Sequence, residues 1–387
     1  MSIEGIALFN DGYLPILDGV SMTVKNYALW LNRKAAPSVV VTPYFPGYTD
    51  YDEFRVIRYF SAPLPMRHPY RLGLPIFDPS IFQKILAEKL SIVHSHSPFS
   101  AGSLALKVAR KKKIPVVATF HSKFRDDFEV QIPSKIIVDQ MVKQVVKFFE
   151  EVDEVWIPQA RVEETIRSYG YKGRLEVVEN GIDIDTGIDF ELFRNGSRKA
   201  LGISETELVF LFVGQHIWEK NLKFLLEALQ KFNDKPFKAF FAGEGYAKPA
   251  LEKMAAEFGL ENKLTFLGSV HDRQQLKRIY ASANLFLFPS QYDNAPLVLR
   301  EAAALQTPAL LLKNSTAAEV ISDGFNGFLA ENSSDAYAKK MAEICANHSL
   351  QREVGIRASQ TLCRSWENVV DEVIDRYLAL INRKAGH

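Results

Sequence analysis

The sequence has 387 residues, a formal net charge of +1 and 47% hydrophobic residues, which is typical of a globular protein with two domains. This charge argues against a general nucleic-acid binder, no apolar run approaches the roughly 20 residues of a membrane span, and the N-terminus does not resemble a signal peptide. Cys345 and Cys363 lack metal-ligand spacing, so we expect a reduced, cytoplasmic protein.

The first half of the chain alternates short apolar runs with amphipathic segments. Strands are predicted at residues 3–9, 38–42, 92–94, 116–119, 155–157 and 175–178. Helices are predicted at residues 21–32, 79–89 and 101–111. Glycine, asparagine and aspartate then cluster between residues 175 and 205, which indicates a connection between two domains.

The same alternation restarts in the second half. Strands are predicted at residues 209–213, 238–242, 264–267, 285–288 and 309–312, and helices at 221–232, 248–258, 272–281 and from about Pro296. The repeat predicts an α/β protein of two doubly wound parallel-sheet domains, which usually enclose a cleft at the carboxyl edges of their sheets. No GxGxxG follows the first strand and no GxxxxGK[ST] occurs, so a nicotinamide dehydrogenase and a P-loop NTPase are disfavoured.

The stretch SQYDNAPLVLREAAALQTPALL, residues 290–311, combines two acids with a predicted helix start. If the helix begins near Pro296, the amides of Leu297 and Val298 form an anion site at its positive end. Side chains lean toward the N-terminus of a helix, so Glu301 can reach forward beside that anion. A ribose diphosphate would suit both groups, with Asp293 facing whatever lies beyond the phosphates. The plain alternative is a capping aspartate and a solvated glutamate.

Other predicted strand ends in this half carry glycine or charge. Lys220 stands where a loop enters a helix and can neutralise a departing phosphate, although it can also be an ordinary surface lysine. Gly243 and Gly245 follow one strand and Gly268 follows another, as expected where the backbone turns sharply or approaches a ligand. Each feature alone is weak evidence, but several such strand ends in one half of the chain together indicate a ligand site.

Together these residues resemble family 4 of the retaining glycosyltransferases, whose fold is GT-B. Asp293-NAPLVLR-Glu301 is similar to the family's acid-x7-Glu motif, with Asp in place of the usual first Glu. VGQHIWEKN is similar to VGR-x-x-x-EKG/N, except that Gln215 replaces the arginine; a neutral Gln215 donor together with His216 could substitute for it. VVENGID resembles the hinge segment, and HSHSPFS resembles members that glycosylate diacylglycerol.

The resemblance implies an acceptor-binding domain at residues 1–178, a nucleotide-sugar domain at 179–365 and a C-terminal helix at 366–387 that returns to the first domain. It implies catalytic roles for His121, Asp293 and Lys220. It implies donor contacts from Gly19 in a flexible loop, Gln215, Lys220, Gly243, Glu244, Val270, Asp293, Asn294, Ala295, Leu297, Val298 and Glu301. A buried core histidine is the alternative for His121. His94 and His96 would be wall residues, and no metal or other cofactor is expected.

The implied activity is retaining transfer of a hexose from a nucleotide sugar, of the UDP-glucose or UDP-galactose type, to an acceptor hydroxyl, for example of diacylglycerol. Front-face attack would rely on positioning and charge stabilisation of the leaving diphosphate. A soluble or polysaccharide acceptor is one alternative. A catalytically weak nucleotide-binding partner subunit is another, supported by Gln215 and Asp293.

Two basic segments raise the question of a membrane. Residues 107–113 carry a lysine and arginine cluster, and residues 133–153 combine Ile136, Ile137, Met141, Val145, Phe148 and Phe149 with Lys135, Lys143 and Lys147. Such a stretch can bind an anionic membrane surface, which would place the protein peripherally on the inner face of the plasma membrane. The alternative is a core helix with a solvated back.

Overall fold

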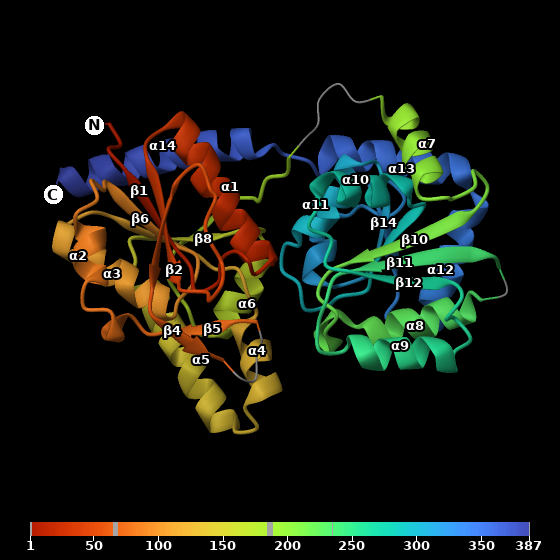
Figure 1. Cartoon of the computed structure of the whole chain (residues 1–387), viewed down its shortest axis with the longest axis horizontal. Helices are drawn as coiled ribbons and strands as arrows, with labels where there is room; N and C mark the ends of the chain where they lie inside the picture. The colour runs from red at the N-terminus through yellow and green to blue at the C-terminus, as the bar shows by residue number, and fades with distance from the viewer. Residues whose placement is uncertain (1, 65–68, 184–188, 234, 387) are drawn as a thin grey trace. The chain divides into compact units, whose positions relative to one another are not determined.

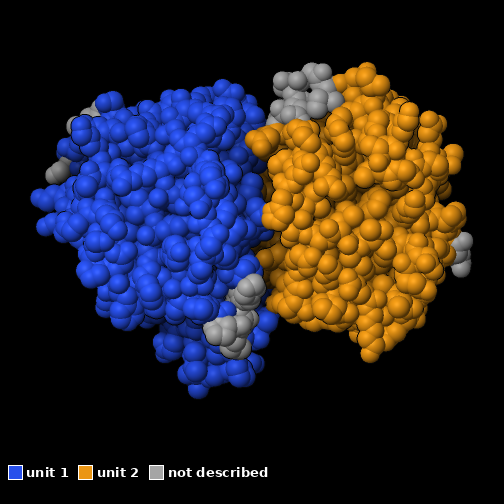
Figure 2. All heavy atoms as spheres, viewed as in Figure 1, with its two compact units in different colours: residues 1–181, 365–387 blue, residues 182–364 orange. Residues whose placement is uncertain are grey.

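The computed structural model describes residues 2–64, 69–183, 189–233 and 235–386. The chain divides into two compact units, unit 1 with residues 1–181 and 365–387, and unit 2 with residues 182–364 (Figure 1, Figure 2). The connecting region predicted at 175–205 includes the last strand of unit 1 and the first helix of unit 2, and its residues 184–188 lie outside those described. Within the described ranges, no helix is both long and apolar enough to cross a membrane.

Unit 1 contains a seven-stranded parallel sheet in the order β3-β2-β1-β6-β7-β8-β9. Its strands are β1 (Ile6–Phe9), β2 (Ser38–Pro43), β3 (Arg55–Tyr59), β6 (Ile92–Ser95), β7 (Val116–Thr119), β8 (Glu154–Ile157) and β9 (Leu175–Val177), beside a small antiparallel pair of β4 (Ser61–Pro63) and β5 (Arg71–Gly73). Its helices are α1 (Gly19–Lys34), α2 (Ile81–Leu86), α3 (Ser100–Lys112), α4 (Phe124–Gln131), α5 (Lys135–Glu150), α6 (Val162–Ser168) and α14 (Trp366–Ala385).

The C-terminal helix α14 belongs to unit 1, as the predicted fold requires. It packs on α1, where the rings of Trp366 and Tyr27 meet edge to face. Tyr377 stacks on Trp156 of β8 with ring centroids 5.7 Å apart, and its hydroxyl lies 2.6 Å from Nδ1 of His94. The apolar side of α14 therefore completes the first unit's core.

Unit 2 contains a six-stranded parallel sheet in the order β12-β11-β10-β13-β14-β15. Its strands are β10 (Leu208–Val213), β11 (Phe237–Ala242), β12 (Leu264–Gly268), β13 (Leu285–Phe288), β14 (Ala309–Leu312) and β15 (Phe328–Ala330). Its helices are α7 (Phe190–Ala200), α8 (Leu222–Lys231), α9 (Lys248–Glu257), α10 (Arg273–Ser282), α11 (Leu297–Ala304), α12 (Ser334–Ala346) and α13 (His348–Thr361).

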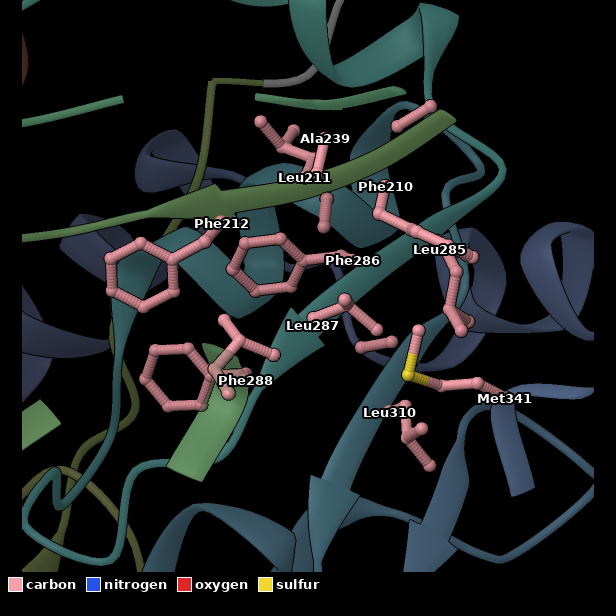
Figure 3. Packing of buried hydrophobic residues seen from close by; sticks show 14 of the residues in the cluster. Phe210, Leu211, Phe212, Ala239, Leu285, Phe286, Leu287, Phe288, Leu310 and Met341 are labelled. Carbon is pink, nitrogen blue, oxygen red and sulfur yellow. The ribbon is translucent and has the colours of Figure 1, made fainter. Parts of the chain in front are cut away.

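The strands are apolar at successive positions because helices cover both faces of each sheet. Every residue of β13 and β14 is buried. Side chains from β10, β13 and β14 pack with Met341 of α12 in one continuous core, and Phe286 stacks on Phe288 (Figure 3). Two such units confirm the predicted doubly wound α/β fold.

Some elements differ from the prediction. The first strand begins at Ile6 rather than at residue 3, because the ladder starts where the Ile6 amide donates to Pro37. Strands β3, β4, β5 and β15 were not predicted. The last three have only three residues each, so pairing with a neighbour rather than local pattern decides them. The predicted helix at 79–89 is confined to α2.

Candidate active site

The strand order of unit 2 reverses between β10 and β13. In a doubly wound sheet this switch point, at the carboxyl ends of the strands, is where ligands bind, because the loops on its two sides diverge. The loop after β10 leads to Lys220, and the loop after β13 carries Asp293. The Asn221 side chain donates to the Pro289 carbonyl oxygen at 3.3 Å and joins the two loops.

Lys220 and Asp293 form an ion pair in which Lys220 Nζ donates to Oδ1. The two side chains are only 12% and 15% exposed, and Nζ also lies 5.3 Å from the ring centroid of Tyr292. The second oxygen of Asp293, Oδ2, is buried and accepts no hydrogen bond from any described residue. A buried carboxylate oxygen without a donor is costly, so this atom is poised for a ligand hydroxyl.

Asp293 does not cap helix α11. The capping position is Pro296, without a side-chain cap hydrogen bond. The first amides of the helix belong to Leu297 and Val298, which have no acceptor inside it. Asn294 is buried and Ala295 partly buried in the loop just before Pro296. The helix start thus offers amide donors and a positive dipole end next to the Lys220–Asp293 pair.

Glu301 is not a solvated glutamate, since its side chain is 15% exposed. Oε1 accepts from Arg273 Nη1 at 3.0 Å, and Oε2 accepts from the Tyr280 hydroxyl at 2.9 Å. Burial and the nearby carboxylate raise the pKa of Tyr280 well above its ordinary value, so Tyr280 remains a donor. All three residues line a partly open pocket of about 100 Å³ within unit 2, together with Ile182, Asp183, Phe190, Leu276, Lys277, Ala304, Leu305 and Gln306.

The loops after β11 and β12 lie beside the β10 loop. Gly243 has φ of +136°, and a Cβ there would lie 2.0 Å from the Gly214 carbonyl oxygen. Glycine is therefore required at this position because the backbone of the neighbouring β10 loop approaches it closely. Glu244 is bound by Lys248 at 2.8 Å on the half-exposed side of this loop, and Val270 is partly buried against the core.

Gln215 is partly exposed, and His216 is buried in unit 2. The His216 ring lies among Phe212, Phe241 and Phe266, and neither ring nitrogen has a hydrogen-bond partner among the described residues. Burial lowers its pKa to about 4. This ring is therefore neutral near pH 7, so it supplies no positive charge in place of an arginine.

In unit 1, His121 follows β7 and His96 follows β6 at the carboxyl edge of the sheet. His96 Nδ1 lies 3.0 Å from His121 Nε2, and the two rings stack. His121 is partly buried, and burial lowers its pKa to about 3. Within the described parts of the chain, no group of three or more His, Cys, Asp or Glu residues is placed to hold a metal ion.

Gly19 is the first residue of helix α1, not part of a flexible loop. Asp18 caps this helix by accepting from the Ser21 amide at 2.7 Å, and the Ser21 hydroxyl accepts from the Asp18 amide at 3.0 Å. A Cβ on Gly19 would meet nothing within 4 Å. The local prediction for Gly19 was wrong because the capping box was not recognised.

Comparison with known proteins identifies the chain. A family model described as glycosyl transferases group 1 matches residues 193–361, and one described as Glycosyltransferase Family 4 matches residues 17–186. The chain belongs to the family 4 glycosyltransferases. It is 26% identical to the alpha-monoglucosyldiacylglycerol synthase of Streptococcus pneumoniae over 84% of this chain and 74% of that protein. It is 24% identical to the synthase of the same name from Acholeplasma laidlawii over 98% of this chain and 100% of that protein.

Solved structures agree on the fold of this glycosyltransferase. Sucrose-phosphate synthase from Thermosynechococcus elongatus superposes with a TM-score of 0.79 at 19% identity, covering 98% of this chain and 100% of that one. Anabaena HepE in complex with UDP and glucose superposes with a TM-score of 0.76 at 17% identity, with the same coverage. The fold is GT-B, and the enzyme is a hexosyltransferase that acts on a nucleotide sugar.

Sequence reasoning missed two residues of the glycosyltransferase that hold Glu301. Arg273 and Tyr280 are seven positions apart on α10 and so share one face of the helix. That spacing is a usable signal, but their partner lies on another helix. Reasoning from sequence also missed Ser290, whose hydroxyl accepts from the amides of Tyr292 and Asp293 at 3.2 and 3.3 Å and shapes the loop.

Proposed function

We propose that this enzyme transfers glucose or galactose from a UDP-sugar to the hydroxyl of a membrane lipid such as diacylglycerol, with retention of the anomeric configuration. The observation that carries the proposal is the unsatisfied Asp293 Oδ2 beside Lys220 and the start of α11. A sugar hydroxyl supplies the missing donor, and a diphosphate suits the lysine and the amides. The two relatives named alpha-monoglucosyldiacylglycerol synthase support the lipid acceptor.

The nucleotide sugar would be bound by unit 2, with separate groups for its ribose and its diphosphate. An ionised carboxylate has about four lone-pair sites, so Glu301 can accept from ribose hydroxyls while it also accepts from Arg273 and Tyr280. The Leu297 and Val298 amides and Lys220 would bind the diphosphate. We keep Gly19, Gln215, Gly243, Glu244, Val270, Asn294 and Ala295 as proposed donor contacts.

The proposed chemistry depends on positioning and charge. The acceptor hydroxyl attacks the anomeric carbon on the face from which the diphosphate leaves, and a phosphate oxygen takes the proton. Lys220 and the α11 amides stabilise the charge that develops on the leaving group. His121 bonds a hydroxyl of the transferred sugar. The proposal assigns no step to a metal ion or another cofactor.

A donor screen with purified protein tests the nucleotide. A true donor at a hundred times its dissociation constant should stabilise the fold by about 2.7 kcal/mol, which thermal unfolding with UDP-, GDP- and ADP-sugars measures. Glu301→Gln should reduce the shift, because an amide accepts fewer hydrogen bonds from ribose. HepE was solved with UDP and glucose, which motivates UDP as the first nucleotide. A response to GDP- or ADP-sugars alone would contradict the UDP assignment.

An acceptor assay tests the reaction. UDP-glucose or UDP-galactose with diacylglycerol in mixed micelles should yield a glycolipid whose anomeric centre matches the donor, as read by the proton coupling constant of the product. Transfer only to soluble sugars or polyols would favour the alternative acceptor class. Binding of the nucleotide sugar without hydrolysis or transfer to any acceptor would favour the alternative of a nucleotide-binding partner subunit, which Asp293 and Gln215 support.

We propose that the beginning of α5 docks unit 1 on the membrane. The C-terminal part of α5 is a core element, since Val145, Phe148 and Phe149 are buried. By contrast, Ile136 and Ile137 are 77% and 52% exposed, with the exposed Lys135 next to them. Apolar side chains beside basic ones are suited to an anionic bilayer surface.

The docking proposal predicts a loss of vesicle binding in the double variant Ile136→Ser with Ile137→Ser. Affinity for phosphatidylglycerol vesicles should fall at least about tenfold, because burial of one such side chain contributes about 1.5 kcal/mol. Leu192→Ser in unit 2, where Leu192 is 72% exposed, is the matched control and should bind as the parent does. Co-sedimentation that is independent of both anionic lipid and the double variant would contradict the proposal.

A further inference from the structure

Three histidines lie together in unit 1, and their contacts differ. His94 has both ring nitrogens occupied, with Nδ1 at 2.6 Å from the Tyr377 hydroxyl and Nε2 at 2.8 Å from the Thr119 hydroxyl. His96 faces His121, with 3.0 Å between His96 Nδ1 and His121 Nε2 and ring planes inclined by 20°. The other nitrogen of His96, Nε2, is buried and has no hydrogen-bond partner among the described residues.

The short contact between His96 and His121 requires one proton between the two nitrogens. Burial, followed by the neighbouring rings of His94 and His121, lowers the pKa of His96 well below its usual range. Burial lowers the pKa of His121 to about 3. Both rings are therefore neutral near pH 7, and each neutral imidazole carries a single N–H. Either His96 donates from Nδ1 to His121, or His121 donates from Nε2 to His96.

The unpartnered Nε2 of His96 decides between these arrangements. If His121 were the donor, the single proton of His96 would sit on Nε2 as a buried N–H without an acceptor. Orphaned buried N–H groups are rarer in proteins than acceptors with a spare lone pair. If His96 donates from Nδ1, its Nε2 carries only an unused lone pair. The arrangement in which His96 donates therefore leaves no donor unsatisfied on His96.

We propose that His96 is a positioning residue that donates from Nδ1 to Nε2 of His121 and holds His121 as its Nδ1–H tautomer. A substrate hydroxyl that contacts His121 then meets an N–H donor at Nδ1, while Nε2 is engaged by His96. His121 consequently orients a hydroxyl and does not take the acceptor's proton, which leaves that proton to the departing phosphate. The contact with substrate rests on the proposed function, but the tautomer does not.

Nitrogen chemical shifts test the tautomer directly. The full chain, labelled with ¹⁵N-histidine, is measured at pH 7.5 by long-range ¹H–¹⁵N correlation, and His121→Gln assigns the His121 signals. We expect the protonated-nitrogen shift at Nδ1 of His121 and the unprotonated shift at Nε2. The reverse pattern in the parent protein would overturn the proposal, whatever the enzyme's activity.

Two variants of His96 test the cause. His96→Phe keeps a ring but removes the donor to Nε2 of His121, so the Nδ1–H tautomer of His121 loses its hydrogen bond and its population should fall below that in the parent protein. His96→Asn places an amide N–H near the position of Nδ1 and should preserve the parent tautomer. An unchanged His121 pattern in a folded His96→Phe protein would show that His96 does not set it. His94→Phe, which removes the neighbouring ring without a hydrogen bond to His121, should leave the pattern of His121 unchanged.

Kinetics then separate positioning from folding. In an active assay, His96→Phe should lower kcat about five- to tenfold, the effect of a misdirected neutral hydrogen bond, with a smaller change in the KM for donor. His96→Asn should recover most of the rate. Equal losses in the two variants at equal thermal stability would contradict the positioning role, while the nuclear magnetic resonance result stands or fails independently of turnover.

Discussion

Each of the two sheets has a carboxylate at the point where its strand order reverses, but the surroundings of the two carboxylates differ. In unit 1, Asp11 follows β1 and accepts from the hydroxyls of Ser97 and Ser100 and from the Ala101 amide at 3.1 Å. Burial raises its pKa, although these hydrogen bonds lower it in part. In unit 2, the Asp293 carboxylate is paired with Lys220, and its Oδ2 has no hydrogen-bond partner in the part of the chain that the structure describes.

The difference separates a structural carboxylate from one suited to a ligand. Asp11 joins β1 to the start of α3 and is saturated by its own unit. Asp293 sits beside a lysine, a helix start and the Glu301 cluster, so unit 2 concentrates ionised groups with spare hydrogen-bonding capacity. At the edge of the first sheet lies His121, a partly buried imidazole that is neutral near pH 7. Two sheets with a similar strand order therefore carry a neutral site in unit 1 and a charged site in unit 2.

Removal of Lys220 should give the largest effect on activity. Lys220→Met takes away the cation that stabilises the leaving diphosphate, so kcat/KM for transfer should fall at least about a hundredfold. It also leaves Asp293 as a nearly buried, unpaired charge, which should destabilise the fold by about 3 kcal/mol. Steady-state transfer assays and urea unfolding measure the two effects. Lys223→Met, at a lysine that is 64% exposed, should leave both within experimental scatter.

The double variant Lys220→Met with Asp293→Asn separates the two roles of the pair. Without the ionised carboxylate the lysine is no longer needed for stability, so the free energy of unfolding should return toward that of the parent protein. Transfer should stay low, because the phosphate still lacks its cation and the sugar hydroxyl loses the Asp293 carboxylate. If transfer returned together with stability, Lys220 would only support the loop. Asp293 would then be a structural carboxylate like Asp11, and not one suited to a ligand.

Arg273 should have a smaller effect, confined to donor binding. Arg273→Gln removes the charged partner of Glu301 but leaves the Tyr280 hydroxyl in place, so the carboxylate loses one of its two fixed contacts. We expect the KM for nucleotide sugar to rise about five- to tenfold, the value of one partly exposed charged hydrogen bond, with kcat nearly unchanged.

A double-mutant cycle checks that Arg273 acts through Glu301. In a Glu301→Gln background, Arg273→Gln should change KM by less than about twofold, because the ionic contact is already gone. Full additivity of the two substitutions would instead assign Arg273 an independent contact with the donor. The charged site of unit 2 would then be larger than the cluster described.

The sheet cores and the positions of the site loops could be predicted because both follow from local pattern. Strands such as β10 and β13 are continuous apolar runs, and a parallel sheet sends the following loops to one edge. Lys220 and Asp293 were therefore expected at that edge. Their ion pair was not, because strand order and loop length do not determine which way two side chains point.

The contacts that cross between elements could not be predicted from sequence. Glu301 is held by two residues of α10, and His94 is bonded to a tyrosine 283 positions away on α14. Each depends on how two helices or a helix and a strand pack. Gly243 illustrates the same limit, since a glycine after a strand indicates a close approach, but only the structure identifies the Gly214 backbone as its cause.

The smallest effect is expected at His216, which is an uncharged group inside the charged unit. Its pKa is about 4 in the folded protein and about 6.5 in an unfolded chain. Between these values the unfolded ring binds a proton that the folded ring does not, so stability is lost as the pH falls. At pH 5 this difference costs about 2 kcal/mol. His216→Leu should therefore be more stable than the parent by that amount at pH 5, relative to their difference at pH 7.5.

Urea unfolding of the two proteins at both pH values measures this double difference, in which the histidines of unit 1 cancel because both proteins contain them. At pH 7.5 the substitution should be nearly neutral or slightly stabilising, since it replaces a buried ring whose nitrogens lack partners by an apolar side chain. His348→Leu, at an exposed histidine outside the aromatic enclosure, is the control for loss of an imidazole. A pH-independent difference for His216→Leu would mean that the folded ring reaches solvent, and that the aromatic enclosure around it opens.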